Sequence, residues 1–205
     1  MLPTQRDDPW GPFHPERLIL KVAFWSAVIL FAICLAINIV SRFGYDLTQL
    51  VHTHWSKMEG SDPEVAFVRP ISSAVVILSI PLVFRLGRLG WRQDRLVQDL
   101  LAAPSWLKFA GGFLWLYVAA TMIYVDIAFH GGGPLIHNGV GTIWLKGEGR
   151  YELVSPQAYH HAVAIMMVFI SAWGMTGFAF LAIAYLGWLQ NTASSRIATE
   201  QPALL

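Results

Sequence analysis

The sequence has few charged residues for its length. Asp, Glu, Lys and Arg make up 13% of the 205 residues, whereas about 25% is usual for a soluble domain. The hydrophobic share is 55% and the mean hydropathy is +0.50. This balance predicts an integral membrane protein. With 14 basic and 13 acidic residues the net charge is only +1, so the basic surface typical of nucleic-acid-binding proteins is absent from the sequence.

Cysteine is nearly absent too. The single cysteine, Cys34, lies inside an apolar run. One cysteine cannot form a disulfide within the chain, and this excludes the paired-cysteine chemistry of membrane thiol oxidoreductases. The sequence also has no internal repeat and no low-complexity segment.

Four long apolar runs dominate what is present. A helix needs about 20 apolar residues to cross roughly 30 Å of hydrocarbon. Runs of this length lie at 18–40, about 65–86, 106–129 and 160–189. The second run contains Pro70 and Pro81, which membrane helices tolerate when neighbouring groups satisfy the freed carbonyls. We therefore predict an all-α integral membrane protein with four transmembrane helices in a bundle.

Basic residues near the ends of these runs predict the orientation. The segment between the second and third runs carries five of them: Arg85, Arg88, Arg92, Arg95 and Lys108. We expect this segment in the cytoplasm, together with residues 1–17 and the tail 190–205. The loops 41–64 and 130–159 then lie on the outer face of a bacterial inner (cytoplasmic) membrane. The first run is too long for the apolar part of a signal peptide, so we expect it to be retained.

This orientation gathers the histidines on one face. Of the seven histidines, only His14 falls in the cytoplasm. The other six lie in or beside the outer loops: His52, His54, His130, His137, His160 and His161. Scattered histidines would not be expected to collect on one side, so this clustering is the strongest functional signal in the sequence.

Asp126 and His130 form the first candidate site. They are four residues apart at the end of the third run, so one helix face carries both side chains. An ionisable residue inside a span is unfavourable and by default marks a functional site. His160 and His161 open the next, antiparallel run at the same depth. A carboxylate with imidazoles suits copper or zinc, so we predict a metal site formed by Asp126, His130, His160 and His161.

Other interpretations of the same residues stay open. Asp126 is also placed for an ion pair with Arg69, which would make the cluster structural. His130 with His160 or His161 suits a haem near the outer surface, or the cluster belongs to a quinone site. Asn38 is the other notable polar residue inside a span.

Two further segments carry predictions. "VHTHW" supplies His52 and His54, a candidate second metal cluster, because a His-x-His pair in an extended segment can chelate copper. The glycine-containing stretch 138–156 has turn signals and weak alternation, which predict an outer β-hairpin. Small residues in the fourth run, among them Gly174 and Gly177, predict close approach of neighbouring helices.

The layout around Asp126 resembles the C subunit of the particulate methane and ammonia monooxygenases, which are membrane copper enzymes. In that family an Asp-x3-His pair follows a span, and a further histidine opens the next span after a Thr-Pro turn. Here "DIAFH" supplies Asp126 and His130, and "SPQAYHH" supplies Ser155, Pro156 and the histidines that follow. The resemblance covers about residues 15–185. It implies a metal bound on the periplasmic side of a multi-subunit monooxygenase.

We therefore expect one subunit of a membrane oxidoreductase complex, with copper, or alternatively zinc, as cofactor. Two alternatives are a haem- or quinone-linked electron-transfer anchor and a non-catalytic accessory or transporter subunit. The expected partners are other membrane subunits and the lipid bilayer, and no nucleic acid.

Overall fold

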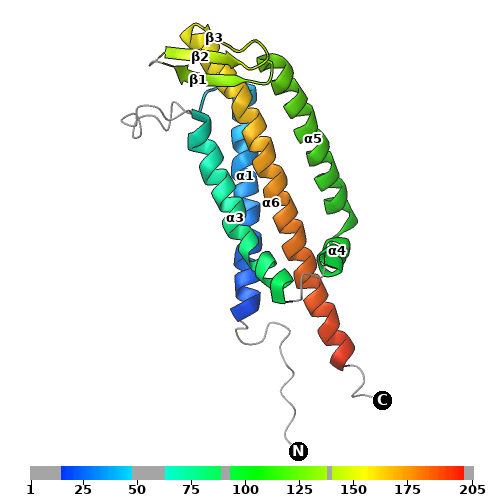
Figure 1. Ribbon diagram of the computed structural model, residues 1–205. Coiled ribbons are helices and arrows are strands. Elements are labelled where there is room, and N and C mark those ends of the chain that lie inside the picture. The colour runs from blue at the N-terminus through cyan, green and yellow to red at the C-terminus, as the bar shows by residue number, and fades with distance from the viewer. Residues whose placement is uncertain (1–14, 48–62, 89–92, 138–139, 201–205) are drawn as a thin grey trace, which may run out of the picture.

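The computed structural model describes residues 15–47, 63–88, 93–137 and 140–200. Four of the described helices are long and apolar enough to cross a membrane: α1 (Pro15–Arg42), α3 (Pro63–Arg88), α5 (Ser105–Phe129) and α6 (Pro156–Glu200). The predicted helical membrane protein is confirmed at this level. Successive helices run in opposite directions, so the start of α1 and the end of α6 lie at one end of the bundle (Figure 1).

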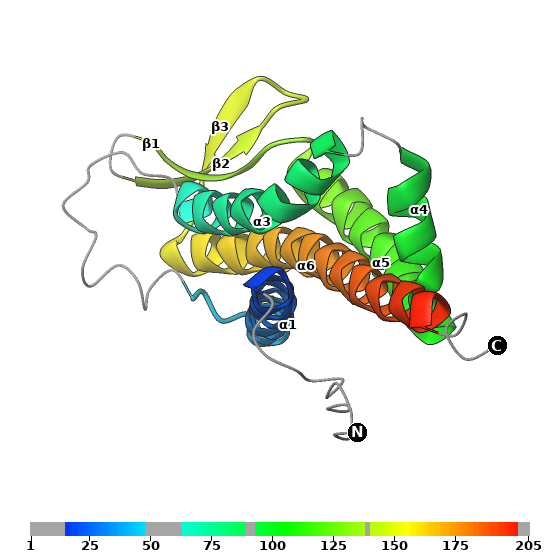
Figure 2. The same cartoon turned by 90° about the horizontal axis from the view of Figure 1, so that it is seen from below.

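α6 is the central helix, and α1, α3 and α5 pack around it (Figure 2). In an apolar stretch of 18 residues within its span, Pro156–Gln190, 61% of the residues are buried, against 22% or fewer in the matching stretches of the other three spans. Glycines allow the close contacts that the sequence predicted. A Cβ atom on Gly174 would lie 2.7 Å from Cys34 Sγ, and one on Gly177 would lie 3.2 Å from Val75 Cγ2. Backbone approach of this kind is the usual role of small residues between membrane helices.

The segment between α3 and α5 contains a short helix, α4 (Gln93–Ala102), where the sequence predicted only a basic loop. Its Leu96, Val97, Leu100 and Leu101 repeat with helical spacing, a pattern that favours an amphipathic helix. α4 packs against α6, and Leu100 contacts the hydrophobic core. We call this end of the bundle the α4 end.

The opposite end carries a three-stranded antiparallel sheet, with strand order β1-β2-β3. The strands are β1 (Gly133–His137), β2 (Val140–Leu145) and β3 (Arg150–Leu153). Gly133 pairs with Trp144, and Thr142 pairs with Leu153. The predicted hairpin is confirmed as β2–β3. β1 was not predicted, because it is short and contains Pro134, which is compatible only with an edge strand. We call this end the sheet end.

Local signals explain how the chain enters and leaves the sheet. α5 stops at His130, which adopts a left-handed conformation with φ of 49°, and Gly131 follows with φ of 76°. The backbone N–H of Gly131 donates to the carbonyl of Asp126, as is common at helix C-termini. α6 begins at Pro156, and the Ser155 hydroxyl accepts a bond from the N–H of Ala158 at 3.2 Å. Serine followed by proline is a favoured helix start.

Candidate functional site at the sheet end

The predicted metal ligands lie at the sheet end but do not form one cluster. Asp126, His130 and His161 are exposed, and His160 is half-buried. Among the described residues, no group of three or more His, Cys, Asp or Glu side chains is arranged to hold a metal ion. His52 and His54 lie outside the described residues. The copper or zinc site and the haem alternative therefore stay predictions.

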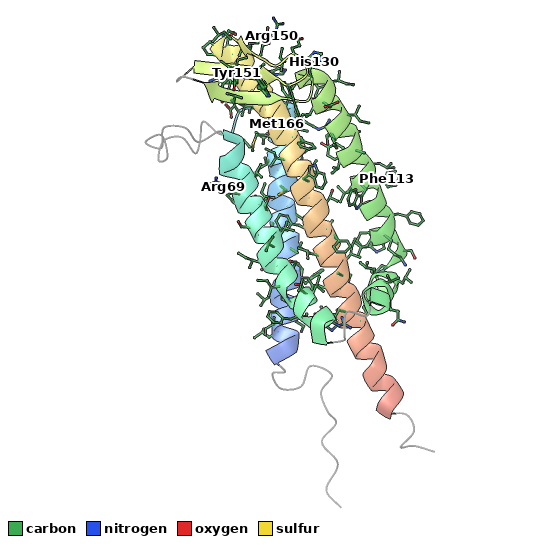
Figure 3. All side chains as sticks on the ribbon, in the orientation of Figure 1. Arg69, Phe113, His130, Arg150, Tyr151 and Met166 are labelled. Carbon is green, nitrogen blue, oxygen red and sulfur yellow. The ribbon has the colours of Figure 1, made fainter. Side chains whose placement is uncertain are left out.

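Asp126 lies on the outer surface of α5. Neither a hydrogen bond nor an ion pair joins its carboxylate to another residue that the structure describes. The predicted pair with Arg69 is not formed within the described chain. Arg69 is exposed on α3, and α6 lies between α3 and the end of α5 marked by His130 (Figure 3). Both charges are thus left on the surface of the bundle.

His160 instead binds Asp46, in the segment that follows α1. Its Nδ1 lies 2.7 Å from Asp46 Oδ2, and the Asp46 side chain is only 1% exposed. Because a carboxylate only accepts hydrogen bonds, Nδ1 is the donor. Gly44, with φ of 81°, turns the chain beyond α1 toward α6, so that the pair ties this segment to the start of α6. The sequence predicted only an outer loop at 41–64, and it did not predict the contact between Asp46 and His160.

A pocket of about 430 Å³ opens between α1, α5 and α6 near the sheet end. Its apolar wall is formed by Ala120, Ala164, Ile165 and Val168. Its polar side chains come from all three helices: Ser41, Arg42, Tyr117, Thr121, Tyr124 and His161. This lining contains a guanidinium, several hydroxyls and an imidazole but no carboxylate. A ligand that accepts hydrogen bonds therefore fits its chemistry.

A hydrogen-bond network that is buried at Asn38 and exposed at Arg42 holds Arg42 at the pocket. Asn38 is only 4% exposed, and its Nδ2 donates to the Val168 carbonyl at 2.8 Å and to Ser171 Oγ at 2.9 Å. Its Oδ1 accepts from the Tyr117 hydroxyl at 2.7 Å. That hydroxyl in turn accepts from Arg42, at 2.8 Å from Nη2 and 3.2 Å from Nε. Because the network links α1, α5 and α6, it restrains the guanidinium while leaving some of its N–H groups for a ligand.

Ser41 supplies a second sign of a ligand position. It is 3% exposed, and its hydroxyl has no hydrogen-bond partner among the described residues. Buried polar groups are almost always paired, so an orphan hydroxyl in a pocket wall indicates where a bound molecule or a water would donate or accept. The sequence singled out Asn38 and His161 as polar residues of interest, but it gave no signal for Arg42, Tyr117 or Tyr124.

Comparison of the chain with protein-family models, with curated proteins and with solved structures finds no match. The resemblance to the monooxygenase C subunit therefore rests on the sequence motifs alone.

Proposed function

We propose that the protein is a quinone-linked membrane subunit of an oxidoreductase complex, with a quinone head group bound between α1, α5 and α6. The donor-rich lining of the pocket, within helices long enough to span a membrane, carries this proposal. Of the functions that the sequence suggested, this one uses side chains that the structure brings together. A metal subunit would require ligands that the described residues do not group.

The pocket has the size and chemistry that a quinone ring needs. Its volume of about 430 Å³ lies within the range of small-molecule sites. Ring carbonyl oxygens accept hydrogen bonds, and Arg42, Tyr124 and His161 supply donors around the pocket. Ala120, Ala164, Ile165 and Val168 form an apolar wall beside these donors. Because the pocket lies between spans, an isoprenoid tail would extend into the bilayer.

The lining residues have distinct roles in this proposal. Arg42, held by the Tyr117 hydroxyl, stabilises negative charge on a ring oxygen. His161 is exposed at the sheet end and exchanges protons with water. Electrons come from a redox centre in a partner subunit. By the distribution of basic residues, the pocket faces the outer side of a bacterial inner membrane.

Binding of decylubiquinone to the full chain in phosphatidylcholine nanodiscs tests the proposal. We expect saturable binding, and Arg42→Gln should raise the Kd about tenfold or more, as for loss of a hydrogen bond to a charged group. Tyr124→Phe and His161→Gln should raise it a few-fold. Arg150→Gln is the matched control, because Arg150 lies on the sheet and pairs with Glu148.

Two results would contradict the proposal. One is an unchanged Kd in Arg42→Gln. The other is failure of decylubiquinone to bind, together with an Arg42-dependent enrichment of phosphatidylglycerol around the protein in mixed-lipid nanodiscs. That second result would assign the same donors to an anionic lipid head group.

A further inference from the structure

α3 and α5 leave an apolar groove over α6, on a different side of the bundle from the quinone pocket. The groove has a volume of about 660 Å³, and its walls come from α3, α5 and α6. Trp115 of α5 packs edge-on against Trp173 of α6, with ring centroids 6.2 Å apart. Trp173 and Phe180 stay exposed there, although α6 is the most buried span. Lipid covers apolar side chains as well as protein does, so apolarity alone does not identify what lies in the groove.

Arg69 and Asp126 lie at the sheet end, on the helix faces that line the groove. On α3, Arg69 precedes Ser72 and Val76 by three and seven residues, and both of these line the groove. Arg69 therefore extends the same helix face. On α5, Asp126 follows the groove residue Trp115 by eleven residues, about three turns, and also shares its face. Both side chains are exposed, and ionisable residues inside spans usually pair with one another.

We infer that the α3–α5 face is the interface of a homodimer, in which Arg69 of each copy pairs with Asp126 of the other. A two-fold axis along the membrane normal sets α3 of one copy against α5 of its partner, and α5 against α3. Arg69 and Asp126 both lie at the sheet end of their helices. The same symmetry operation therefore forms both ion pairs at once and closes the groove of each copy against the other.

The sheet gives independent support for this face. It projects from the bundle past α3, on the side opposite α1 (Figure 2), and most of the groove residues outside α6 belong to α3. β3 is an edge strand, and its Leu153 is 74% exposed. Tyr151, two positions earlier on the same strand, is also exposed. Edge strands with exposed apolar side chains are normally covered. A second copy on the α3–α5 face would also approach this edge.

Lys146 is a competing partner for Asp126 within the chain. A Cβ atom on Gly131 would lie 3.4 Å from Asp126 Oδ1 and 3.8 Å from Lys146 Cδ, so the two side chains are near each other. No ion pair joins them among the described residues. The experiments must therefore separate an Arg69 pair between copies from a Lys146 pair within one copy.

Disulfide cross-linking between two differently marked chains tests the interface directly. A tagged Arg69→Cys chain is co-expressed with an untagged Asp126→Cys chain, and the membranes are mildly oxidised. Each chain has one introduced thiol, and the native Cys34 is buried, so a disulfide between positions 69 and 126 must join two copies. We expect a tagged–untagged covalent dimer. No dimer above the wild-type background, or equal dimer from Arg69→Cys chains alone, would overturn the interface.

Charge reversal tests the ion pairs. Arg69→Asp and Asp126→Arg should each weaken dimerisation about tenfold or more, and the double variant should recover most of the loss. The monomer–dimer equilibrium is measured by fluorescence energy transfer between labelled copies in liposomes. A wild-type chain that stays monomeric contradicts the inference. So does a result in which Lys146→Gln reproduces the effect of Asp126→Asn while Arg69→Gln has none.

Discussion

At the scale of single residues, the two adjacent histidines at the start of α6 have different surroundings. His160 donates to Asp46, whose side chain is almost completely buried, whereas His161 lines the pocket. Neighbouring positions on a helix point about 100° apart, so consecutive residues can serve unrelated purposes. The two histidines therefore place a hydrogen-bonded side chain and a pocket-lining side chain within a single turn.

We predict that the two alanine substitutions change stability by different amounts. His160→Ala should lower the free energy of unfolding by about 1–3 kcal/mol, because the buried Asp46 carboxylate loses this hydrogen bond. His161→Ala should change it by less than about 0.5 kcal/mol, as is usual for exposed side chains. Thermal or denaturant unfolding in detergent measures both. Equal losses of stability in the two variants would show that the Asp46 contact does not hold the segment after α1.

At the scale of elements, glycine placement decides how closely α6 approaches α1 and α3. Gly174 lies where a Cβ atom would be 2.7 Å from Cys34 Sγ and 3.0 Å from Ile71 Cγ2. At Gly112 of α5, in contrast, a Cβ atom would meet nothing within 4 Å. Glycine thus has a packing role at position 174 and none at position 112.

Gly174→Ala should therefore destabilise the bundle by about 1–3 kcal/mol, the usual range for overpacking a core. Gly112→Ala is the matched control and should leave stability unchanged or slightly raised, since alanine favours helix more than glycine does. Unfolding in detergent, followed by circular dichroism, compares the two. If Gly174→Ala is as stable as Gly112→Ala, the helices do not pack as closely as the structure shows.

At the scale of the whole molecule, the sheet and α4 mark opposite ends of the bundle (Figure 1). The basic residues around α4 predict that this end faces the cytoplasm. The sheet would then be on the outside, together with the mouth of the proposed quinone pocket and the two charges, Arg69 and Asp126, of the proposed dimer interface.

Cysteine labelling checks this orientation. We predict that Lys146→Cys, in the turn between β2 and β3, reacts with a membrane-impermeant maleimide in intact cells. Leu101→Cys, exposed on α4, should react only after the membrane is permeabilised. The wild-type chain is the control, because Cys34 is buried. The reverse labelling pattern would place the sheet and the pocket on the cytoplasmic side.

The sequence by itself determined the spans and much of their local detail. These features depend on local signals: long apolar runs, glycines between helices, and serine followed by proline at Ser155 and Pro156. Because each signal extends over neighbouring residues only, the sequence alone is enough to recognise it. The β2–β3 hairpin was predictable for the same reason. β1 and α4 were not predicted, because a short edge strand and a short amphipathic helix give weak local signals.

Only the tertiary structure decided which polar groups meet. The partners of Asn38, Arg42 and Asp46 lie 133, 75 and 114 residues away along the chain at Ser171, Tyr117 and His160, respectively. No spacing rule links positions so far apart, since the contact depends on how α1 and α5 pack around α6. The same packing leaves Asp126 and Arg69 on the surface instead of pairing them. The sequence therefore identified polar residues of interest, and the fold assigned their partners.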